Sequence, residues 1–438
     1  TKKDNPLVIG LGEGENFIAS DIPAIIAYTR RTYIMNDGEI AVVKKDSIWV
    51  TDRKGNPITK KVFEVNWNAE AAEKGGYEHF MLKEIHEQPK AVRDTISPRI
   101  NKENTQVVLD ELKWTKEYVE NFNKIYIVAC GTAYHAGLVG KYYIEKLARI
   151  PVEIDIASEF RYRDPIIDEH TLTIVISQSG ETSDTLAALK ESKRLGAKTL
   201  AITNVVGSSI AREADQVMYT WAGPEIAVAS TKAYTTQLVT MFLFAMYVSG
   251  LKGTITTERT HELLTQLRLL PDEINRTLED VEPIKTFAKN YAFNNDVFYI
   301  GRSLDYNVAL EGSLKLKEIS YIHAEAYAAG ELKHGTLALI ESGVPVIALA
   351  TQKSVYEKTL SNIKEVKARD AVMIGIAAED DNELEKYVDH VIKVPATDEL
   401  LIPLLTVVPL QLLAYYAAIT RGCDVDKPRN LAKSVTVE

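Results

Sequence analysis

An internal repeat is the feature of this chain that most limits its possible folds. Tyr126-Ile-Val-Ala-Cys-Gly131 and Val297-Phe-Tyr-Ile-Gly301 are both apolar runs that end at glycine and lead into polar residues and a helical segment. The two glycines lie 170 positions apart. The alternation of strand and helix patterns that begins at Lys124 is typical of a parallel sheet flanked by helices. The sequence therefore predicts an α/β protein with two tandem copies of one domain.

The predicted organisation has five parts. We expect a β-rich part over residues 1–69, a linker and helix over 70–95, α/β domains over 96–252 and 253–423, and a polar tail over 424–438. In the first part, the runs Glu39-Ile-Ala-Val-Val-Lys and Ser47-Ile-Trp-Val-Thr-Asp predict a β-hairpin. The segment Gly10-Leu-Gly-Glu-Gly14 is predicted to be a loop, because its third glycine comes one position too early for a dinucleotide-binding fingerprint.

Two uncharged runs, Ala233 to Leu251 and Leu400 to Thr420, are long enough to cross a bilayer. They end at nearly the same offset as the repeated glycines, so each would be the last helix of one copy. The second run also contains Pro403 and Pro409. We therefore predict two buried core helices and no membrane partner.

Composition excludes several functional classes. The chain has 438 residues, a net charge of −10 and no long basic block, which argues against a nucleic-acid partner. Its two cysteines, Cys130 and Cys423, are far apart, so neither a zinc site nor a disulfide framework is indicated. A reducing cytoplasm is the expected setting.

The first copy contains a candidate phosphate site. Thr173 to Ile176 are all β-branched, as in a buried parallel strand, and Ser177-Gln-Ser-Gly-Glu-Thr-Ser183 follows with four hydroxyl residues. Ala187, Ala188 and Leu189 then continue as a helix would. A polar loop before a helix directs free N–H groups and the positive end of the helix dipole outward. This pattern predicts a phosphate monoester site without Lys or Arg, although Thr182 or Ser183 could simply cap the helix.

The second copy differs at the matching position. Its corresponding strand, Val344-Pro-Val-Ile-Ala-Leu-Ala-Thr351, is followed by Gln352-Lys-Ser-Val and not by a serine-rich loop. We therefore expect the first copy to hold the phosphate and the second copy to serve another purpose.

Three further positions could carry chemistry. Lys315 and Glu318 are three positions apart on a predicted helix and so share one face. Glu318 could be a general base whose pKa is adjusted by the charge of Lys315, or the two could form an ion pair on the surface. His334 lies in a predicted loop between Gly330 and Gly335, where it could be catalytic or incidental. Lys433 lies in the polar tail, which could close over a sugar phosphate or remain solvated.

Four motifs together resemble the glutamine–fructose-6-phosphate aminotransferase family of bacterial type. They are Ser177-Gln-Ser-Gly-Glu-Thr182, Val228-Ala-Ser-Thr-Lys232, Glu325-Ala-Tyr-Ala-Ala-Gly-Glu-Leu-Lys-His334-Gly, and the terminal Pro428-Arg-Asn-Leu-Ala-Lys-Ser-Val-Thr-Val-Glu438. The resemblance covers essentially the whole chain. It implies two flavodoxin-like sugar isomerase domains in a cytoplasmic homodimer, with no cofactor and no metal ion. The positions that depart from the family pattern are Ala133, where Ser is common, and Thr336, where Pro is common.

The resemblance also implies roles for individual residues. It makes Lys433 the lysine that forms a Schiff base with fructose 6-phosphate, Glu318 with Lys315 the base that moves a proton between C1 and C2, and His334 the ring-opening residue, supplied by the partner subunit. The substrate-binding residues that it implies are Thr132, Ser177, Gln178, Ser179, Thr182, Val228, Ser230 and Ala432. The implied reaction replaces the lysine with ammonia derived from glutamine and yields glucosamine 6-phosphate, the first step toward UDP-N-acetylglucosamine.

The family also has a glutaminase domain whose nucleophile is an N-terminal cysteine. Residues 1–69 resemble only the last part of that domain, and no cysteine precedes Cys130. We therefore expect this chain to carry the synthase half alone and not to hydrolyse glutamine. Two other functions remain open for the same domains, a phosphosugar isomerase and a sugar-phosphate-sensing module. The absence of a helix-turn-helix pattern and the presence of Lys433 argue against the sensing module.

Overall fold

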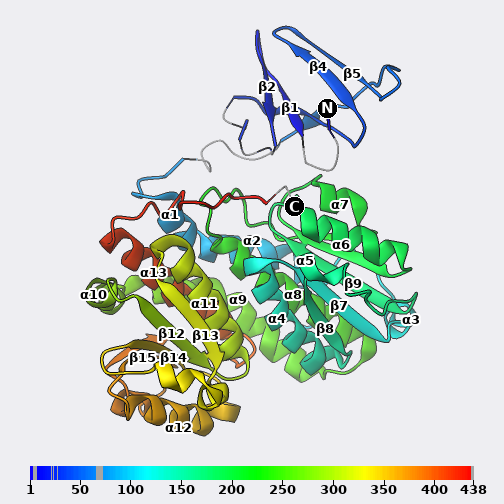
Figure 1. Ribbon diagram of the computed structural model, residues 1–438. Helices are drawn as coiled ribbons and strands as arrows, with labels where there is room; N and C mark the ends of the chain where they lie inside the picture. Colours follow the sequence, from blue (N-terminus) through cyan, green and yellow to red (C-terminus); the bar gives the residue numbers. More distant parts are fainter. Residues whose placement is uncertain (3–6, 21, 23, 27, 66–72, 436–438) are drawn as a thin grey trace.

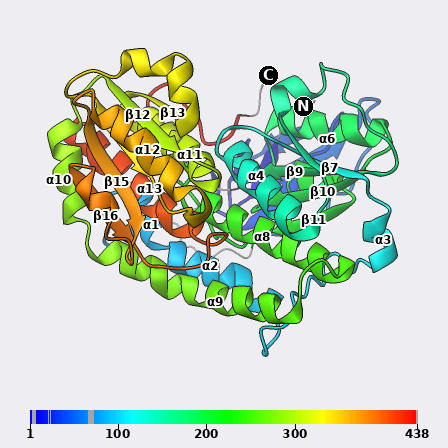
Figure 2. The same ribbon diagram turned by 90° about the horizontal axis from the view of Figure 1, so that it is seen from below.

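The computed structural model describes residues 1–2, 7–20, 22, 24–26, 28–65 and 73–435. The expected boundary between residues 69 and 70 and the last three residues of the tail therefore lie outside the described residues. Figure 1 shows a small β part above two α/β units, which lie side by side. The view from below in Figure 2 shows that the two α/β units share a layer of long helices.

The N-terminal part is β-rich, as its sequence predicted, and its strands pair antiparallel. A four-stranded sheet has the order β2-β1-β3-β6, and β4 and β5 form the expected hairpin with Val42 opposite Trp49. The strands are β1 Val8–Leu11, β2 Asn16–Ala19, β3 Arg31–Ile34, β4 Ile40–Lys44, β5 Ser47–Thr51 and β6 Phe63–Glu64. The glycine-rich segment lies partly in a strand, because Gly10 belongs to β1, and it joins two antiparallel strands. It is therefore not the strand-to-helix turn of a dinucleotide site.

Two short helices follow where one was expected. They are α1 Phe80–His86 and α2 Gln88–Ile96, and Pro89 lies in the first turn of α2, where it needs no backbone donor. Glu87 ends the first helix and begins the second. Both helices pack against the long helices of the α/β units.

The first α/β unit has a five-stranded parallel sheet in the order β11-β10-β9-β7-β8. All seven residues of its central strand β9 are buried, which explains the β-branched run of the sequence. The strands are β7 Lys124–Ala129, β8 Val152–Ile156, β9 Thr171–Ser177, β10 Lys198–Thr203 and β11 Gln216–Tyr219. The helices are α3 Lys116–Glu120, α4 Gly131–Tyr143, α5 Ala157–Phe160, α6 Ser183–Arg194, α7 Ser209–Glu213 and α8 Lys232–Lys252.

The second unit repeats this topology with the order β13-β12-β14-β15-β16. Its strands are β12 Asp296–Gly301, β13 His323–Ala328, β14 Pro345–Leu349, β15 Val372–Ala378 and β16 His390–Val394. Its helices are α9 Thr257–Glu279, α10 Glu282–Tyr291, α11 Leu304–Ser320, α12 Tyr356–Lys367 and α13 Pro403–Thr420. Read from the opposite edge, the first sheet has the order β8-β7-β9-β10-β11, which matches the second sheet strand for strand. The predicted duplication is therefore confirmed.

The two apolar runs form the last helix of each copy, α8 and α13. Both helices are long and apolar enough to cross a membrane, but 83% of the apolar stretch in each is buried inside the protein. They contact each other, and they also pack on α4 and α11, the first helices of the two sheets. Both are therefore core helices, as the repeat predicted.

Candidate active site

The predicted phosphate loop lies at the carboxyl end of β9, where parallel sheets commonly bind ligands. Ser177 Oγ lies 2.9 Å from Thr182 Oγ1 and accepts a hydrogen bond of 3.0 Å from the Gly180 N–H. Gly180 has a φ of 65°, and a side chain there would collide with Ser208. The loop therefore depends on glycine for both its backbone conformation and its close packing.

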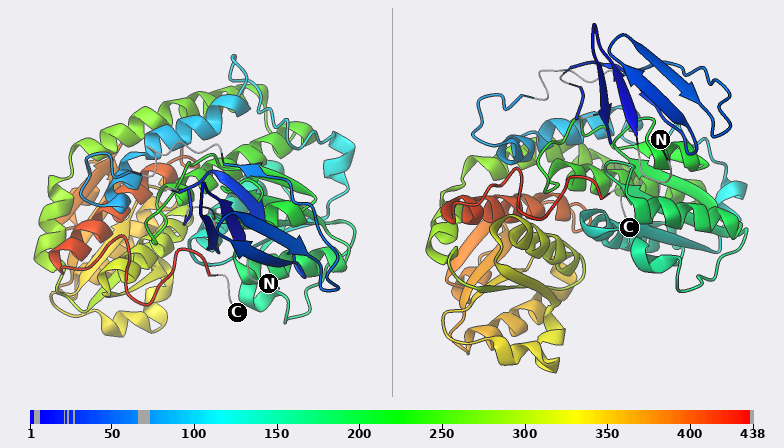
Figure 3. Two further views of the ribbon diagram at one scale, coloured as in Figure 1. Left: turned by 90° about the horizontal axis from the view of Figure 1, so that it is seen from above. Right: turned by 45° about the horizontal axis from the view of Figure 1, so that its top comes forward.

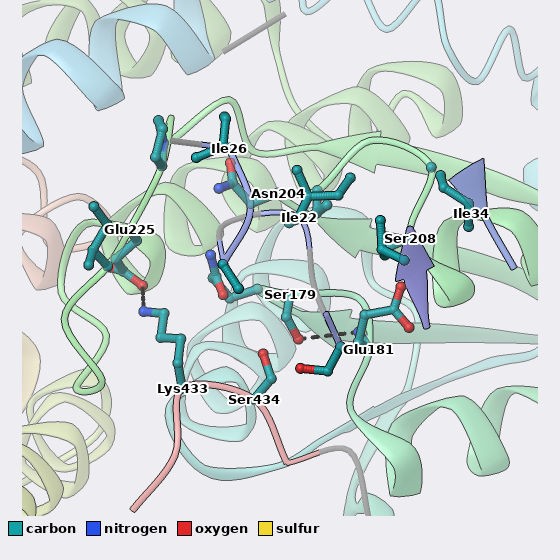
Figure 4. A pocket seen from close by; sticks show the side chains of 18 of the residues that line it. Ile22, Ile26, Ile34, Ser179, Glu181, Asn204, Ser208, Glu225, Lys433 and Ser434 are labelled. Atoms are coloured by element: carbon teal, nitrogen blue, oxygen red, sulfur yellow. Dashed lines mark hydrogen bonds and ion pairs between the residues drawn. The ribbon is translucent and has the colours of Figure 1, made fainter. Parts of the chain in front are cut away.

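A cavity of about 420 Å³ lies beside this loop. Figure 4 shows Ser179, Glu181 and Ser208 on one side of it and Glu225 and Lys433 on the other. Its lining also includes Val8, Ile22, Ile26, Ile34, Gln178, Asn204, Ile226 and Ser434. Figure 3 shows the N-terminal β part lying over the first α/β unit, and Val8 of β1 and Ile34 of β3 line the cavity from that side. The cavity is thus bounded by three parts of the chain that are far apart in sequence.

The C-terminal tail returns from the second copy to the phosphate loop. The Val228 N–H donates to the carbonyl of Asp426 at 3.0 Å, and the Ser183 N–H donates to the carbonyl of Val435 at 3.2 Å. The Asp426 carboxylate also accepts hydrogen bonds from the Phe80 and Met81 N–H groups at the start of α1. These contacts hold the tail against the first copy and against α1.

Lys433 points from the tail into the cavity. Its Nζ donates to Glu225 Oε2 at 2.6 Å and to the Ala227 carbonyl at 2.8 Å. The Glu225 side chain is fully buried. Burial alone would raise the pKa of Glu225, but the Lys433 ammonium and its hydrogen bond lower it. Lys433 and Glu225 therefore form an ion pair inside the cavity.

Helix α11 contributes a second charged cluster. Lys315 Nζ lies 2.6 Å from Glu318 Oε2 and 3.4 Å from Glu311 Oε1, and its side chain is almost completely buried. Burial opposes the charge on this ammonium, yet the carboxylates of Glu311 and Glu318 raise the pKa of Lys315. Lys315 also donates to Thr132 Oγ1 at 2.9 Å.

The same cluster joins the two copies. Thr132 and His135 lie on α4 of the first copy, and both contact the buried Glu311 of the second, with distances of 3.1 Å from Thr132 Oγ1 to Oε1 and 2.8 Å from His135 Nδ1 to Oε2. Helices α4 and α11 therefore contact each other through these polar residues. The expected sugar contact Thr132 and the expected base Glu318 are therefore linked through Lys315.

The other residues predicted for the site lie in three separate segments of the chain. Val228 and Ser230 are half-buried in the segment that leads into α8, and Ala432 is exposed beside Lys433. His334 ends a 3₁₀ helix, Ala329–His334, in place of the expected loop, and its side chain is exposed. It does not line the cavity. The single chain thus brings Lys433 to the phosphate loop, whereas Thr132, Glu318 and His334 are not among the residues that line the cavity.

The second copy holds an anion of its own at the position that matches the phosphate loop. The Asp305 carboxylate is buried at the start of α11 and accepts hydrogen bonds from the Thr351 N–H at 2.7 Å, the Thr351 hydroxyl at 2.5 Å and the Gln352 N–H at 3.3 Å. Burial raises the pKa of Asp305 to about 6. The donors at the end of β14 are therefore already used by a side chain, which agrees with the predicted division between the copies.

The sequence did not single out Glu225, Glu84, His135 or Glu311. Glu84 lies on α1, and its Oε1 accepts hydrogen bonds from the Ile226 and Ala227 N–H groups. Their contacts that join the parts of the site, Glu225 with Lys433, Glu84 with Ile226 and His135 with Glu311, connect residues more than 100 positions apart, so no motif spacing reveals them. The one available signal was the presence of acidic residues in otherwise apolar segments, which is common in soluble proteins.

Comparisons with known proteins agree with this architecture. The SIS domain family matches twice, over residues 119–247 and 292–421. The chain is 63% identical over its whole length to glutamine–fructose-6-phosphate aminotransferase (isomerizing) of Caldanaerobacter subterraneus and 60% identical to that of Clostridium tetani, and it covers 72% of each relative. The solved C-terminal domain of glucosamine-fructose-6-phosphate aminotransferase from Francisella tularensis superposes with a TM-score of 0.77 at 42% identity, covering 82% of this chain and all of that domain. The chain belongs to the glutamine–fructose-6-phosphate aminotransferase (isomerizing) family.

Proposed function

We propose that this chain converts fructose 6-phosphate and ammonia into glucosamine 6-phosphate through a Schiff base on Lys433. One observation carries the proposal: Lys433 shares a cavity with Gln178 and Ser179 of the phosphate loop. A primary amine beside an anchored sugar phosphate is the arrangement that a ketose Schiff base needs. The names of the curated relatives specify the same substrate and glutamine as the nitrogen donor.

The phosphate loop anchors the substrate in this proposal. The hydroxyls of Ser177, Ser179 and Thr182, together with the Gln178 amide, would donate hydrogen bonds to the phosphate oxygens. The start of α6 adds the partial positive charge of the helix dipole. Thr132, Val228, Ser230 and Ala432 would contact the sugar. The loop supplies binding energy that is distant from the reacting carbons, which orients C1 and C2 toward the reacting groups.

The chemical steps use Lys433 and Glu318. The Lys433 amine adds to the C2 carbonyl of the open-chain ketose, and water leaves to give an iminium. Ammonia then adds to C2 and displaces the lysine. Glu318 moves a proton from C1 to C2, which completes the change from ketose to aldose, and Lys315 stabilises the carboxylate form of Glu318 through their 2.6 Å contact.

His334 completes the site from a second subunit. We propose a homodimer in which His334 of each chain opens the sugar ring in the other chain. Its exposed position, away from the cavity of its own chain, supports this arrangement. We propose that the dimer is located in the cytoplasm and that it uses ammonia derived from glutamine.

The test is reductive trapping in the full chain. Borohydride added with fructose 6-phosphate is expected to fix the sugar on Lys433, and added ammonia is expected to give glucosamine 6-phosphate. Labelling of any other residue would contradict the Schiff-base assignment. A phosphosugar isomerase would instead form glucose 6-phosphate and give no amino sugar with ammonia. A sugar-phosphate-sensing module would bind the substrate and return it unchanged.

A further inference from the structure

The two carboxylate oxygens of Glu225 have separate partners. Oε1 accepts hydrogen bonds from the N–H groups of Thr231 at 2.9 Å and Ala233 at 3.0 Å, which are at the start of α8. Oε2 accepts the 2.6 Å hydrogen bond from Lys433 Nζ. The backbone contacts hold the carboxylate in one orientation. One oxygen is thereby directed at the lysine.

Glu84 holds the segment that follows Glu225. Its Oε1 accepts hydrogen bonds from Ile226 N–H at 2.5 Å and Ala227 N–H at 3.3 Å. The carbonyl of Ala227 is the second acceptor for Lys433. Both acceptors for the lysine thus belong to a three-residue segment that is fixed from α1.

A lysine ammonium has no free electron pair, so it must lose a proton before it can attack a carbonyl. We propose that Glu225 removes this proton from Lys433 and later gives it to the oxygen that leaves C2 as water. This inference rests on the proposed function, in which Lys433 forms the Schiff base. Glu225 is then a catalytic residue, because it contacts the attacking nitrogen.

The step balances in atoms and charge. Proton transfer gives the free amine and the Glu225 carboxylic acid. The amine adds to the C2 carbonyl, and its own proton moves to the oxygen to form a carbinolamine. Glu225 then protonates the hydroxyl, water leaves, and the products are an iminium and the Glu225 carboxylate.

The charges around Glu225 permit this exchange. Burial disfavours the carboxylate, while the Lys433 ammonium lowers the pKa of Glu225, so loss of the lysine charge makes proton uptake easier. Burial, and then the charge of Glu225, raise the pKa of Glu84, which approaches Glu225 from α1. The cations that act on this carboxylate pair are Lys232 from α8, Lys315 from α11 and Lys433 itself.

The experiment measures how fast borohydride traps fructose 6-phosphate on Lys433 in the full chain, with the site located by mass spectrometry. Glu225→Gln is expected to slow trapping by about 10²–10⁴-fold, the usual contribution of a positioned base. The trapping rate of this variant should rise about tenfold per pH unit from pH 6 to 9, because base from solvent must then remove the lysine proton. Wild type should be nearly independent of pH between 6 and 7.5, since proton transfer occurs within the ion pair.

A matched control exists in the N-terminal sheet. Glu39 also accepts hydrogen bonds from a backbone N–H, that of Asn36 at 2.7 Å, and from the Nζ of a half-buried lysine, Lys60, at 2.8 Å. Glu39→Gln is expected to leave the trapping rate unchanged. Glu225→Asp keeps a carboxylate on a shorter arm, so it should recover part of the rate with the flat pH profile of the wild type.

The outcomes separate the two proposals. Equal trapping rates in folded Glu225→Gln and wild type would overturn the role of Glu225 while leaving the Schiff base intact. Failure of wild type to label Lys433 would overturn the proposed function first. If Glu225→Gln does not fold, the wild-type profile decides: a tenfold rise per pH unit there would show that solvent, and not Glu225, takes the proton.

Discussion

Lys315 Nζ lies 2.6 Å from Glu318 Oε2, within one turn of α11. Lys315 is almost completely buried, whereas about a quarter of the Glu318 side chain is exposed. The lysine therefore holds a carboxylate whose outer face remains available to a ligand. This asymmetry suits a base that must reach a substrate, and it differs from an ion pair on the protein surface.

Glu318→Gln is expected to slow C1–C2 proton exchange by about 10²–10⁴-fold, because the amide cannot accept the proton. Trapping on Lys433 should persist, since that step does not use Glu318. Deuterium exchange from solvent, followed by NMR, measures the effect. Lys317→Gln is the control, because Lys317 is exposed on the same helix. Full exchange in Glu318→Gln would place the base elsewhere.

Lys315→Met is expected to destabilise the fold by about 3–5 kcal/mol, because it leaves the buried Glu311 without a compensating charge. Denaturant unfolding measures the loss. The double variant Lys315→Met/Glu311→Gln should recover part of it, since the second substitution removes the buried carboxylate. A double variant with the sum of both single losses would mean that the two residues do not interact.

Gly180→Ala is expected to weaken both stability and binding of fructose 6-phosphate. The φ of 65° alone costs an alanine about 1–2 kcal/mol, and the added methyl group would also collide with Ser208. Gly422→Ala separates the two causes, because Gly422 has a φ of 72° but open space around it. Calorimetric binding and thermal unfolding of both variants test this. Equal losses in the two would argue against a role for the collision.

The buried Asp305 predicts a pH-dependent stability. Its pKa is raised to about 6, above the ordinary value near 3.8. The contribution of this shift to the free energy of unfolding is therefore complete below pH 4 and is lost as pH rises through 6. The loss amounts to about 3 kcal/mol over this range. Asp305→Asn removes this titration. The free energy of unfolding of the variant, relative to wild type, should therefore rise between pH 4 and 7 in urea unfolding experiments. A difference that stays constant with pH would contradict the raised pKa.

Mixing two inactive variants tests the shared site. His334→Ala and Lys433→Arg should each be inactive alone, but a mixed dimer contains one site with both residues intact. Random pairing then gives roughly a quarter of the wild-type activity. Recovery should require exchange of subunits, for example after mild denaturation and refolding. No recovery in demonstrated mixed dimers would place His334 and Lys433 of one site on the same chain.

The sequence predicted the local features of the fold well, because they depend on nearby residues. The β-branched run at Thr173 to Ile176 became the buried β9, and the spacing of Gly131 and Gly301 revealed the duplicated topology. The strand β13 was not predicted, because its residues alternate small and polar side chains without a continuous apolar run.

The site was harder to predict, since its contacts join distant positions. Lys433 and Glu225 are 208 positions apart, and His135 and Glu311 are 176 apart. Neither pair follows from helical or strand periodicity. Local patterns singled out Lys433 and Glu318, and the motif resemblance assigned their roles, whereas the contact of Glu225 with Lys433 depends on the return of the tail to the first copy.

The contacts of Glu311 with Thr132 and His135 have a consequence for how the protein responds to dilution. In a protein with a single copy per chain, this contact would form between two molecules and would weaken as concentration falls. Here one polypeptide carries both surfaces, and a covalent connection of this kind acts like a local concentration in the millimolar range. Pairing of the two copies is therefore independent of concentration. Under the proposed dimer, the supply of His334 is the one part of the site that dilution would remove.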